Sequence, residues 1–128
     1  MSDSNAPVFI QDPDPDSLSS DVAGFGGLLV STQIPTREDG SVELGDITAQ
    51  SECTLRSLKA SLERAGSSMD RVMHLTIYLT DMADRPAFNK VYQAHFSKPY
   101  PVRCAVGVAD LAIEGMRVEV TALAAKGG

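Results

Sequence analysis

The sequence has no tryptophan, only two cysteines and no long apolar run. Cys53 and Cys104 could pair, but a domain of this size requires no disulfide, so we expect both to stay reduced and to act as small buried apolar residues. Every apolar run falls short of the roughly 20 residues that span a bilayer, which argues against a membrane protein. Residues 1–7 lack the basic and apolar parts of a secretory signal, so we expect a cytoplasmic protein.

Positive charge is also scarce. The 128 residues include 11 Lys and Arg against 17 Asp and Glu, which gives a formal net charge of −6. The basic residues are scattered singly from Arg37 to Lys126, whereas nucleic-acid-binding proteins gather them on one face to contact phosphates. The sequence therefore argues against a nucleic-acid partner.

The chain length allows one domain with one core. Within residues 1–20, the stretch from Gln11 to Asp16 alternates Pro with Asp, which disfavours both a helix and a central strand. We therefore expect residues 1–20 to form an irregular acidic lead-in and residues 21–128 to form a single domain.

Two helices are predicted. The first runs from Asp46 to Ala65, with Asp46 as its N-terminal cap and Gly66 in the position of a left-handed C-terminal residue. Its apolar stripe is formed at helical spacing by Leu55, Leu58 and Leu62. The second helix begins after Asp84 as its cap, has Pro86 in its first turn and ends before Pro99.

Four strands are predicted, at residues 27–35, 71–80, 102–108 and 116–123, with a turn at Arg37–Gly40 after the first. The second strand alternates with a period of two. We expect the helices to cover its apolar face, which consists of Met73, Leu75, Ile77 and Leu79. The other face, which is neither apolar nor charged, is expected to pack against another subunit or to line a wet interior; it consists of His74, Thr76, Tyr78 and Thr80.

This order of elements predicts an α+β fold with a mixed sheet and both helices on one sheet face. No segment of the chain is left to cover the other face. A small domain that leaves half of its sheet bare usually buries it in a closed homo-oligomer, so we expect one here.

The usual motifs for metal and cofactor binding are missing. His74 and His95 have no Cys, Asp or second His at ligand spacing. His74 lies in a predicted strand and His95 on the apolar stripe of a predicted helix, and both positions are more typical of structural histidines. The glycines from Gly24 to Gly27 are not followed by a predicted helix, so they are weak support for a phosphate loop. We expect neither a metal nor a cofactor.

A charged pair stands out in the last two strands. Glu119 points away from the apolar side of its strand, and Arg103 opens the preceding strand. If the two strands form a hairpin, Ala105 lies opposite Glu119, and Arg103 lies diagonal to it on the same face. An interfacial salt bridge and a catalytic pair explain this pattern equally well; in the catalytic pair, Arg103 would bind a substrate carboxylate and Glu119 would activate a water.

Three separated segments resemble the reactive-intermediate deaminase family, also called Rid or YjgF. Residues 30–35, Val-Ser-Thr-Gln-Ile-Pro, resemble the family's V-S-G-Q-I-P. Residues 76–82 with 88–92 resemble T-V-Y-L-T-D-M and V-N-x-V-Y, and residues 101–106 with 118–120 resemble P-A-R-S-x-V and V-E-I-E. The resemblance extends from about Gly27 to Ala124.

The resemblance implies a chorismate-mutase-like fold and a homotrimer with clefts between subunits. It also implies the hydrolysis, without cofactor or metal, of small carboxylate-bearing imines or enamines such as 2-aminoacrylate to a 2-keto acid and ammonia. Arg103 matches the family arginine that binds the carboxylate, and Glu119 matches the glutamate that holds the attacking water with help from a backbone carbonyl near Ala105. Ser31 and Asn89 match other pocket residues.

The chain departs from the family pattern at several pocket positions. Leu18 takes the place of a family tyrosine, Thr32 that of a glycine, Cys104 that of a common serine, and Thr121 that of a second glutamate. Leu18 and Thr32 belong to the part of the family pocket that contacts the substrate, so we expect a substrate other than the usual one of the family. Two alternatives stay open: an enzyme recruited to one pathway, with a different and bulkier substrate, and a non-catalytic regulatory trimer that binds a ligand. A ribonuclease or translation-inhibitor role, given to some members, fits the acidic balance least.

Overall fold

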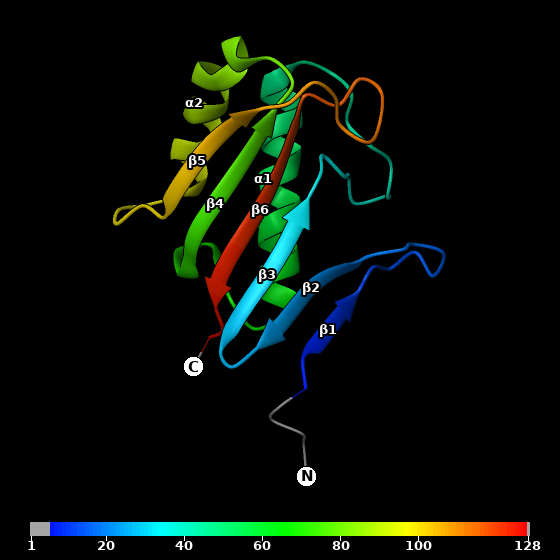
Figure 1. Cartoon of the computed structure of the whole chain (residues 1–128), viewed down its shortest axis with the longest axis vertical. Helices are drawn as coiled ribbons and strands as arrows, with labels where there is room; N and C mark the ends of the chain where they lie inside the picture. The colour runs from blue at the N-terminus through cyan, green and yellow to red at the C-terminus, as the bar shows by residue number, and fades with distance from the viewer. Residues whose placement is uncertain (1–5, 128) are drawn as a thin grey trace.

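The computed structural model describes residues 6–127, which form one six-stranded sheet with two long helices (Figure 1). Most of the residues from which the absence of a secretory signal was predicted lie outside this range. The strands are β1 (Val8–Gln11), β2 (Ser20–Phe25), β3 (Leu28–Gln33), β4 (Val72–Leu79), β5 (Val102–Gly107) and β6 (Val118–Ala125). The helices are α1 (Ile47–Arg64) and α2 (Arg85–His95), with single 3₁₀ turns at Met69–Arg71 and Met82–Asp84.

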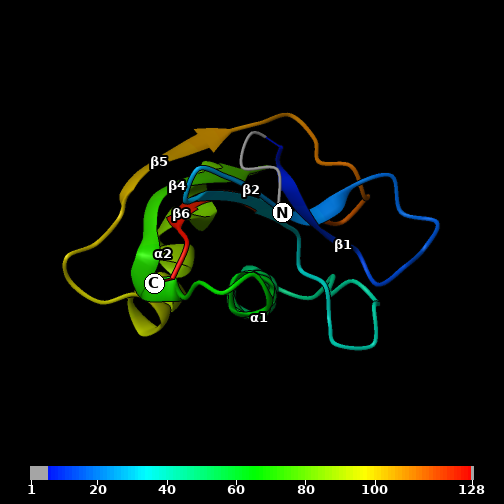
Figure 2. The same ribbon diagram turned by 90° about the horizontal axis from the view of Figure 1, so that it is seen from below.

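The sheet has the strand order β1-β2-β3-β6-β4-β5. Strands β4 and β5 are parallel, and all the other neighbours are antiparallel. Both helices lie on the same side of this sheet (Figure 2). The predicted α+β fold with a mixed sheet and one helix-covered face is therefore confirmed. Neither helix of the described chain is both long and apolar enough to cross a membrane.

The predicted end residues of α1 are confirmed, but the predicted capping role of Asp84 in α2 is wrong. Asp46 Oδ1 accepts a hydrogen bond from the Ala49 amide at 2.8 Å, and Gly66 adopts a φ of +81°. Asp84 occupies the N-cap position of α2 but makes no capping hydrogen bond. Its buried carboxylate instead accepts two hydrogen bonds from Arg117, at 2.6 and 3.0 Å, and so joins the start of α2 to the start of β6.

The predicted alternation of β4 is confirmed except at Met73. Its helix-facing residues Leu75, Ile77 and Leu79 are fully buried, but Met73 is 43% exposed. The register with β6 shifts between Val72 and His74, so Val72 takes the buried position instead. A bulge of this kind is local and cannot be seen in a period-two pattern.

The N-terminal segment is more regular than the sequence predicts. Strand β1 lies within residues 1–20 and pairs with β2, so the prediction of an irregular lead-in is wrong for residues 8–11. A domain boundary at residue 20 stays a prediction. The turn predicted at Arg37–Gly40 is present, with Gly40 at φ +88°, but it is flanked by a single bridge between Thr36 and Val42 instead of a longer hairpin.

The predicted hairpin of the last two strands is wrong. Strand β4 lies between β5 and β6, so Glu119 stands opposite Tyr78, and Ala105 stands opposite Ile77. Paired residues on neighbouring strands point to the same side of a sheet. Arg103 is paired with the buried Leu75 and therefore faces the helices, whereas Glu119 faces the bare side. Within one chain, the two side chains lie on opposite faces of the sheet.

The sheet face that the helices leave uncovered is called the open face below. The register places on it Phe9, Ala23, Phe25, Leu28, Val30, Thr32, His74, Thr76, Tyr78, Val102, Cys104, Val106, Glu119, Thr121 and Leu123. None of these residues is Lys or Arg, and the large apolar ones are exposed. The prediction that the chain leaves one sheet face bare is thus confirmed.

Candidate functional site

Arg103 projects from the edge strand β5 toward helix α2. Its Nη2 donates a hydrogen bond to Asn89 Oδ1 at 2.5 Å. Its guanidinium carbon lies 4.5 Å from the centre of the Tyr92 ring, within the range of a cation–π interaction. Because Asn89 and Tyr92 are three residues apart on α2, they lie on the same side of the helix. Two neighbouring side chains therefore fix the direction of the guanidinium.

The other terminal nitrogen of this guanidinium has no partner. Arg103 Nη1 is buried and donates a hydrogen bond to no acceptor among residues 6–127. The Arg103 side chain borders a hollow of about 240 Å³ lined by Asn89, Tyr92, Gln93, Tyr100, Pro101 and Arg103, which we call the arginine pocket. Its volume falls below the ~300 Å³ at which pockets for drug-sized ligands begin. A small anion, or the anionic end of a larger ligand, fits the size and the charge.

Aromatic rings form the wall of the arginine pocket. The Tyr92 ring stacks on Phe96 with centroids 4.6 Å apart, and the Tyr100 ring lies 5.8 Å away. Burial raises the pKa of the Tyr92 hydroxyl; the Arg103 charge opposes this rise, and Tyr100 adds to it. The packed rings lower the local polarity, which strengthens the attraction between Arg103 and an anion.

Glu119 occupies a different environment, on the open face near the start of the central strand β6. The carboxyl group is half-buried, and burial alone raises its pKa above the ordinary value of 4.5. On the same face, the hydroxyls of Thr32 and Thr121 are 2.8 Å apart. Glu119 and Thr121 are two residues apart on β6 and therefore point to the same face. The carboxyl and the threonine pair form one polar area on a face that is otherwise largely apolar.

Ser31 and Cys104 lie differently from what the sequence predicts. Ser31 faces the core and is 2% exposed; its hydroxyl donates to the Asp21 carbonyl at 2.6 Å and accepts from Gln33 Nε2 at 2.9 Å. Its hydroxyl is thus occupied by contacts that hold β3. Cys104 is exposed on the open face, so the prediction that it is buried is wrong for the single chain. Cys53 is partly buried.

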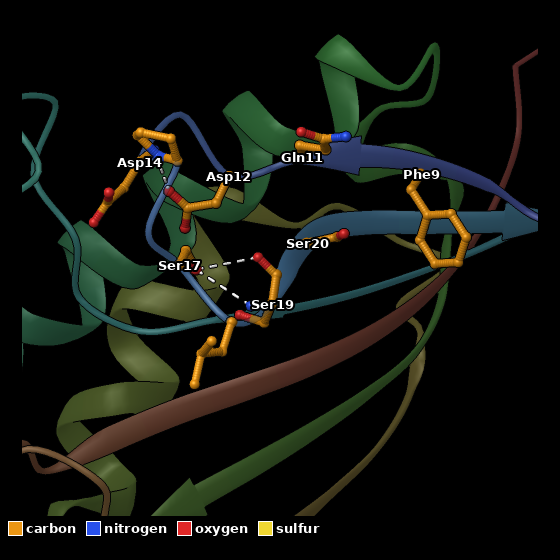
Figure 3. Close-up of a pocket in the computed structure, with 9 residues that line it drawn as sticks. Phe9, Gln11, Asp12, Asp14, Ser17, Ser19 and Ser20 are labelled. Atoms are coloured by element: carbon orange, nitrogen blue, oxygen red, sulfur yellow. Dashed lines mark hydrogen bonds between the residues drawn. The ribbon is translucent and has the colours of Figure 1, made fainter.

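Leu18 belongs to the loop between β1 and β2, and these strands lie at the opposite side of the sheet from β5, the strand of Arg103 (Figure 1). Its side chain is fully exposed. A larger hollow of about 430 Å³ adjoins this loop, where Ser17 and Ser19 are linked by hydrogen bonds (Figure 3). Asp12 and Asp14 line it, and their charges repel a carboxylate. The larger hollow is therefore the poorer candidate for an anionic substrate.

The two histidines have structural surroundings. His95 Nε2 lies 3.0 Å from Glu52 Oε1, and this contact is the main cause that lowers the pKa of Glu52. His74 lies on the open face between Val102 and Leu123. Among residues 6–127, no group of three or more His, Cys, Asp and Glu side chains is arranged to hold a metal ion.

The structure divides five of the predicted site residues into two groups, to which Ser31, Leu18 and Ala105 do not belong. Arg103 and Asn89 meet in the arginine pocket; Glu119, Thr32 and Cys104 lie on the open face. The sequence reading missed Tyr92, Gln93, Tyr100 and Pro101 as neighbours of Arg103. The spacing of Tyr92 and Gln93 at three and four residues after Asn89 was a signal for the first two.

Comparison with known families gives a match over nearly the whole described chain. Residues 15–126 match the family described as Endoribonuclease L-PSP. A RutC family protein of Pyrococcus abyssi is 37% identical over 100 residues, which cover 77% of this chain and 78% of that protein. The mitochondrial protein MMF1 of Saccharomyces cerevisiae is 34% identical over 97 residues, which cover 75% of this chain and 67% of that protein.

A solved structure shares the fold. The crystal structure of RidA from the Antarctic bacterium Psychrobacter sp. PAMC 21119 superimposes with a TM-score of 0.83 at 32% sequence identity. The matched region covers 92% of this chain and 98% of that chain. The six-stranded sheet with two helices is thus the arrangement found in that protein.

Proposed function

Because this chain belongs to the endoribonuclease L-PSP family, which includes the RidA and YjgF proteins, we propose that it hydrolyses small carboxylate-bearing imines and enamines at a site assembled between subunits. The observation that carries this proposal is the unpartnered Nη1 of Arg103 in a small pocket. A buried guanidinium donor without an acceptor is costly, and a substrate carboxylate supplies the missing acceptor.

A site that uses both Arg103 and Glu119 requires two copies of the chain. In one copy these side chains lie on opposite faces of the sheet. The open face carries exposed apolar side chains, and β5 is an edge strand, with one side of its backbone unpaired within residues 6–127. Both features are typical of surfaces that a second subunit covers. A cyclic homotrimer would bring the arginine pocket of one copy against the open face of the next.

The proposed reaction adds water across a C=N bond. An enamine such as 2-aminoacrylate takes a proton on its terminal carbon and becomes an imine. A water oxygen then bonds to the imine carbon while Glu119 accepts one water proton, which gives a carbinolamine. The amino group takes up that proton from Glu119 and leaves as ammonia. The hydroxyl releases its own proton to solvent, which balances the proton taken up by the enamine, and becomes the keto oxygen.

The two residues have different roles in this scheme. Arg103, oriented by Asn89, binds the carboxylate and so holds the imine carbon in place. Glu119 positions the water, and its burial-raised pKa makes it a better proton acceptor than an exposed glutamate. A protonated imine carbon is already electrophilic, so orientation and one base suffice, without metal or cofactor. A backbone carbonyl near Ala105 remains a candidate second acceptor for the water.

The residues that differ from the family pattern are proposed to set the substrate. Thr32 lies in the polar area beside Glu119, and Cys104 lies on the same face at β5. The exposed Leu18 reaches outward and is proposed to contact the site of a neighbouring copy. Ser31 supports Thr32 from the core side through its bond to Asp21. The Thr32 side chain occupies space that a glycine leaves open, and Leu18 is apolar where the family tyrosine has a hydroxyl, so we expect both to change which substrate side chain the site accepts.

Two further questions concern the location of the protein and the description of its family. The cytoplasmic location predicted from the sequence stays a prediction, since the relative MMF1 is named mitochondrial. The family description includes ribonuclease, but the open face has no Lys or Arg to contact phosphates. The following test distinguishes the proposed function from its two alternatives, an enzyme recruited to one pathway and a non-catalytic trimer.

The test generates 2-iminopropanoate from alanine with an amino-acid oxidase and traps it with semicarbazide. The wild-type protein is expected to divert the imine to pyruvate and so to slow semicarbazone formation. Arg103→Ala is expected to abolish this effect, and Arg56→Ala, at a side chain 73% exposed on α1, is expected to keep it. Saturable binding without turnover would favour the regulatory trimer, and turnover of bulkier imines alone would favour the recruited enzyme.

A further inference from the structure

One polar atom of the arginine pocket has no role in the fold. Tyr92 is 4% exposed, and its hydroxyl forms no hydrogen bond with any residue of the described chain. A buried hydroxyl without a partner loses its hydration and gains nothing in return, so a phenylalanine would pack in this position at no loss. The hydroxyl therefore needs an explanation outside the packing of α2.

Tyr92 shares its surroundings with the other unpartnered donor. Arg103 lies over the Tyr92 ring at 4.5 Å, and both residues line the same pocket. Asn89 occupies Nη2 of the guanidinium, which leaves Nη1 for a ligand. Since the side chains that carry both donors line one pocket of about 240 Å³, a single anion with two oxygens would supply an acceptor to each.

We propose that Tyr92 is a second substrate-binding residue, whose hydroxyl donates a hydrogen bond to the carboxylate that Arg103 Nη1 holds. The inference rests on the proposed function and specifies its substrate class: ligands with a free carboxylate are bound in preference to the corresponding amides, because a carboxylate has two acceptor oxygens and a negative charge.

Two properties of the pocket support this role. Burial raises the pKa of Tyr92, so its hydroxyl keeps its proton and acts as a donor at neutral pH. Phe96 stacks against the ring, so the hydroxyl is held in a fixed position. Both donor atoms are shielded from solvent in the free chain, so a ligand has to displace a neighbouring side chain to reach them. The Tyr100 ring lines the same pocket, lies 5.8 Å from the Tyr92 ring and is 44% exposed.

The experiment compares the full-length wild type with Tyr92→Phe and Arg103→Ala by isothermal titration with pyruvate, the expected product, and with the neutral pyruvamide. Tyr92→Phe is expected to raise the Kd for pyruvate about tenfold, equivalent to one hydrogen bond to a charged group, and to leave the Kd for pyruvamide almost unchanged. Since the substitution removes an unpartnered hydroxyl, Tm is expected to stay the same or to rise.

The two proposals fail in different ways. If Arg103→Ala abolishes pyruvate binding and Tyr92→Phe binds pyruvate like the wild type, the role of Tyr92 is refuted and the proposed function stands. A lower Tm for Tyr92→Phe would also refute it, because the hydroxyl would then have a structural partner. If Arg103→Ala binds pyruvate like the wild type, carboxylate binding by Arg103 is wrong, and the inference fails with it.

Discussion

The arginine pocket and the open face differ in how completely one chain builds them. In the arginine pocket, Asn89 and Tyr92 hold Arg103 within hydrogen-bond and cation–π distance. On the open face, Glu119 has no charged partner among the described residues, and the face beyond its polar area consists largely of exposed apolar side chains. The first region is organised before any partner arrives, whereas the second is completed only when something covers it.

This difference indicates a division of work between two copies. A substrate carboxylate needs a rigid, preoriented guanidinium, which one chain supplies alone. A general base needs protection from bulk water, which the uncovered face of one chain does not provide. The Asp84–Arg117 ion pair joins the two regions, because it links the start of α2 to the residue before Val118 in β6.

Loss of the base should have the largest effect. Glu119→Gln is expected to lower kcat by about 10²- to 10⁴-fold with little change in carboxylate binding, because the amide cannot accept a proton. Steady-state kinetics of imine hydrolysis check this, with Glu114→Gln in the exposed loop before β6 as the matched control. Equal loss of binding and of kcat would mean that Glu119 belongs to the arginine pocket and that the comparison is wrong.

Glu119 also predicts a dependence on pH. Its folded pKa is raised above 4.5, so the folded chain binds this proton at higher pH than the unfolded chain does. The contribution of the protonated Glu119 carboxyl to the free energy of unfolding is fully present below the unfolded pKa, and it is lost as the pH rises through the folded pKa. Relative to Glu119→Gln, the wild type should therefore lose stability over this pH range, as denaturant unfolding at several pH values would measure. A parallel pH dependence of the two proteins would contradict the burial of the carboxyl.

Replacement of the guanidinium by an amine should have the next largest effect. Arg103→Lys keeps the charge but loses the planar fork that bonds Asn89 and a carboxylate at once. We expect kcat/KM to fall by about 10- to 100-fold, mainly through KM. The control is Arg56→Lys on the surface of α1. Unchanged kinetics for Arg103→Lys would mean that a point charge is sufficient and that the preoriented fork has no role.

The link between the two regions should affect stability more than binding. Asp84→Asn removes the charge that Arg117 contacts at 2.6 and 3.0 Å, and we expect a loss of about 2 kcal/mol in the free energy of unfolding. Chemical denaturation measures this, with the exposed Asp70→Asn as the control. A stability equal to that of the wild type would show that the ion pair does not hold α2 and β6 together.

The smallest effect is expected at Thr32. Thr32→Val removes the 2.8 Å hydrogen bond to the Thr121 hydroxyl, an exposed contact whose loss should cost about 0.5 kcal/mol of stability. We expect a larger effect on substrate preference: the ratio of kcat/KM for small and bulky imines should change by more than the equivalent of this stability loss, since Thr32 lies in the polar area beside Glu119. Identical relative rates for small and bulky imines in wild type and variant would remove Thr32 from the substrate-contacting residues.

The sequence predicted the elements well where one core dictates their pattern. The apolar stripe of α1 and its end residues Asp46 and Gly66 are local signals, and they hold in the structure. The alternation of β4 correctly separated the helix-facing Leu75 from the open-face Thr76. Strands β1 and β2 were both missed. Strand β1 adjoins an Asp-Pro stretch and forms an edge of the sheet, and Val22 is the one β-branched residue of β2.

The face of Arg103 was predicted wrongly for a physical reason. Pattern analysis assigns apolar residues to the helix-covered side, but in β5 the apolar Val102 and Val106 point to the open face. The apolar residues of such an edge strand can pack against the helices or against a second subunit. The sequence of one chain does not show which of these two surfaces they contact. The strand order also cannot be read from alternation, so the insertion of β4 between β5 and β6 was not foreseen.

Subunit mixing tests the division of the site most directly. Arg103→Ala and Glu119→Gln are each expected to be nearly inactive alone, and they are mixed in equal amounts, dissociated and reassembled. If Arg103 of one copy faces Glu119 of the next around a closed ring, about one quarter of the sites regain both residues, and the mixture regains about one quarter of wild-type activity. A mixture as inactive as its components, in rings shown to contain both variants, would contradict a site shared between copies.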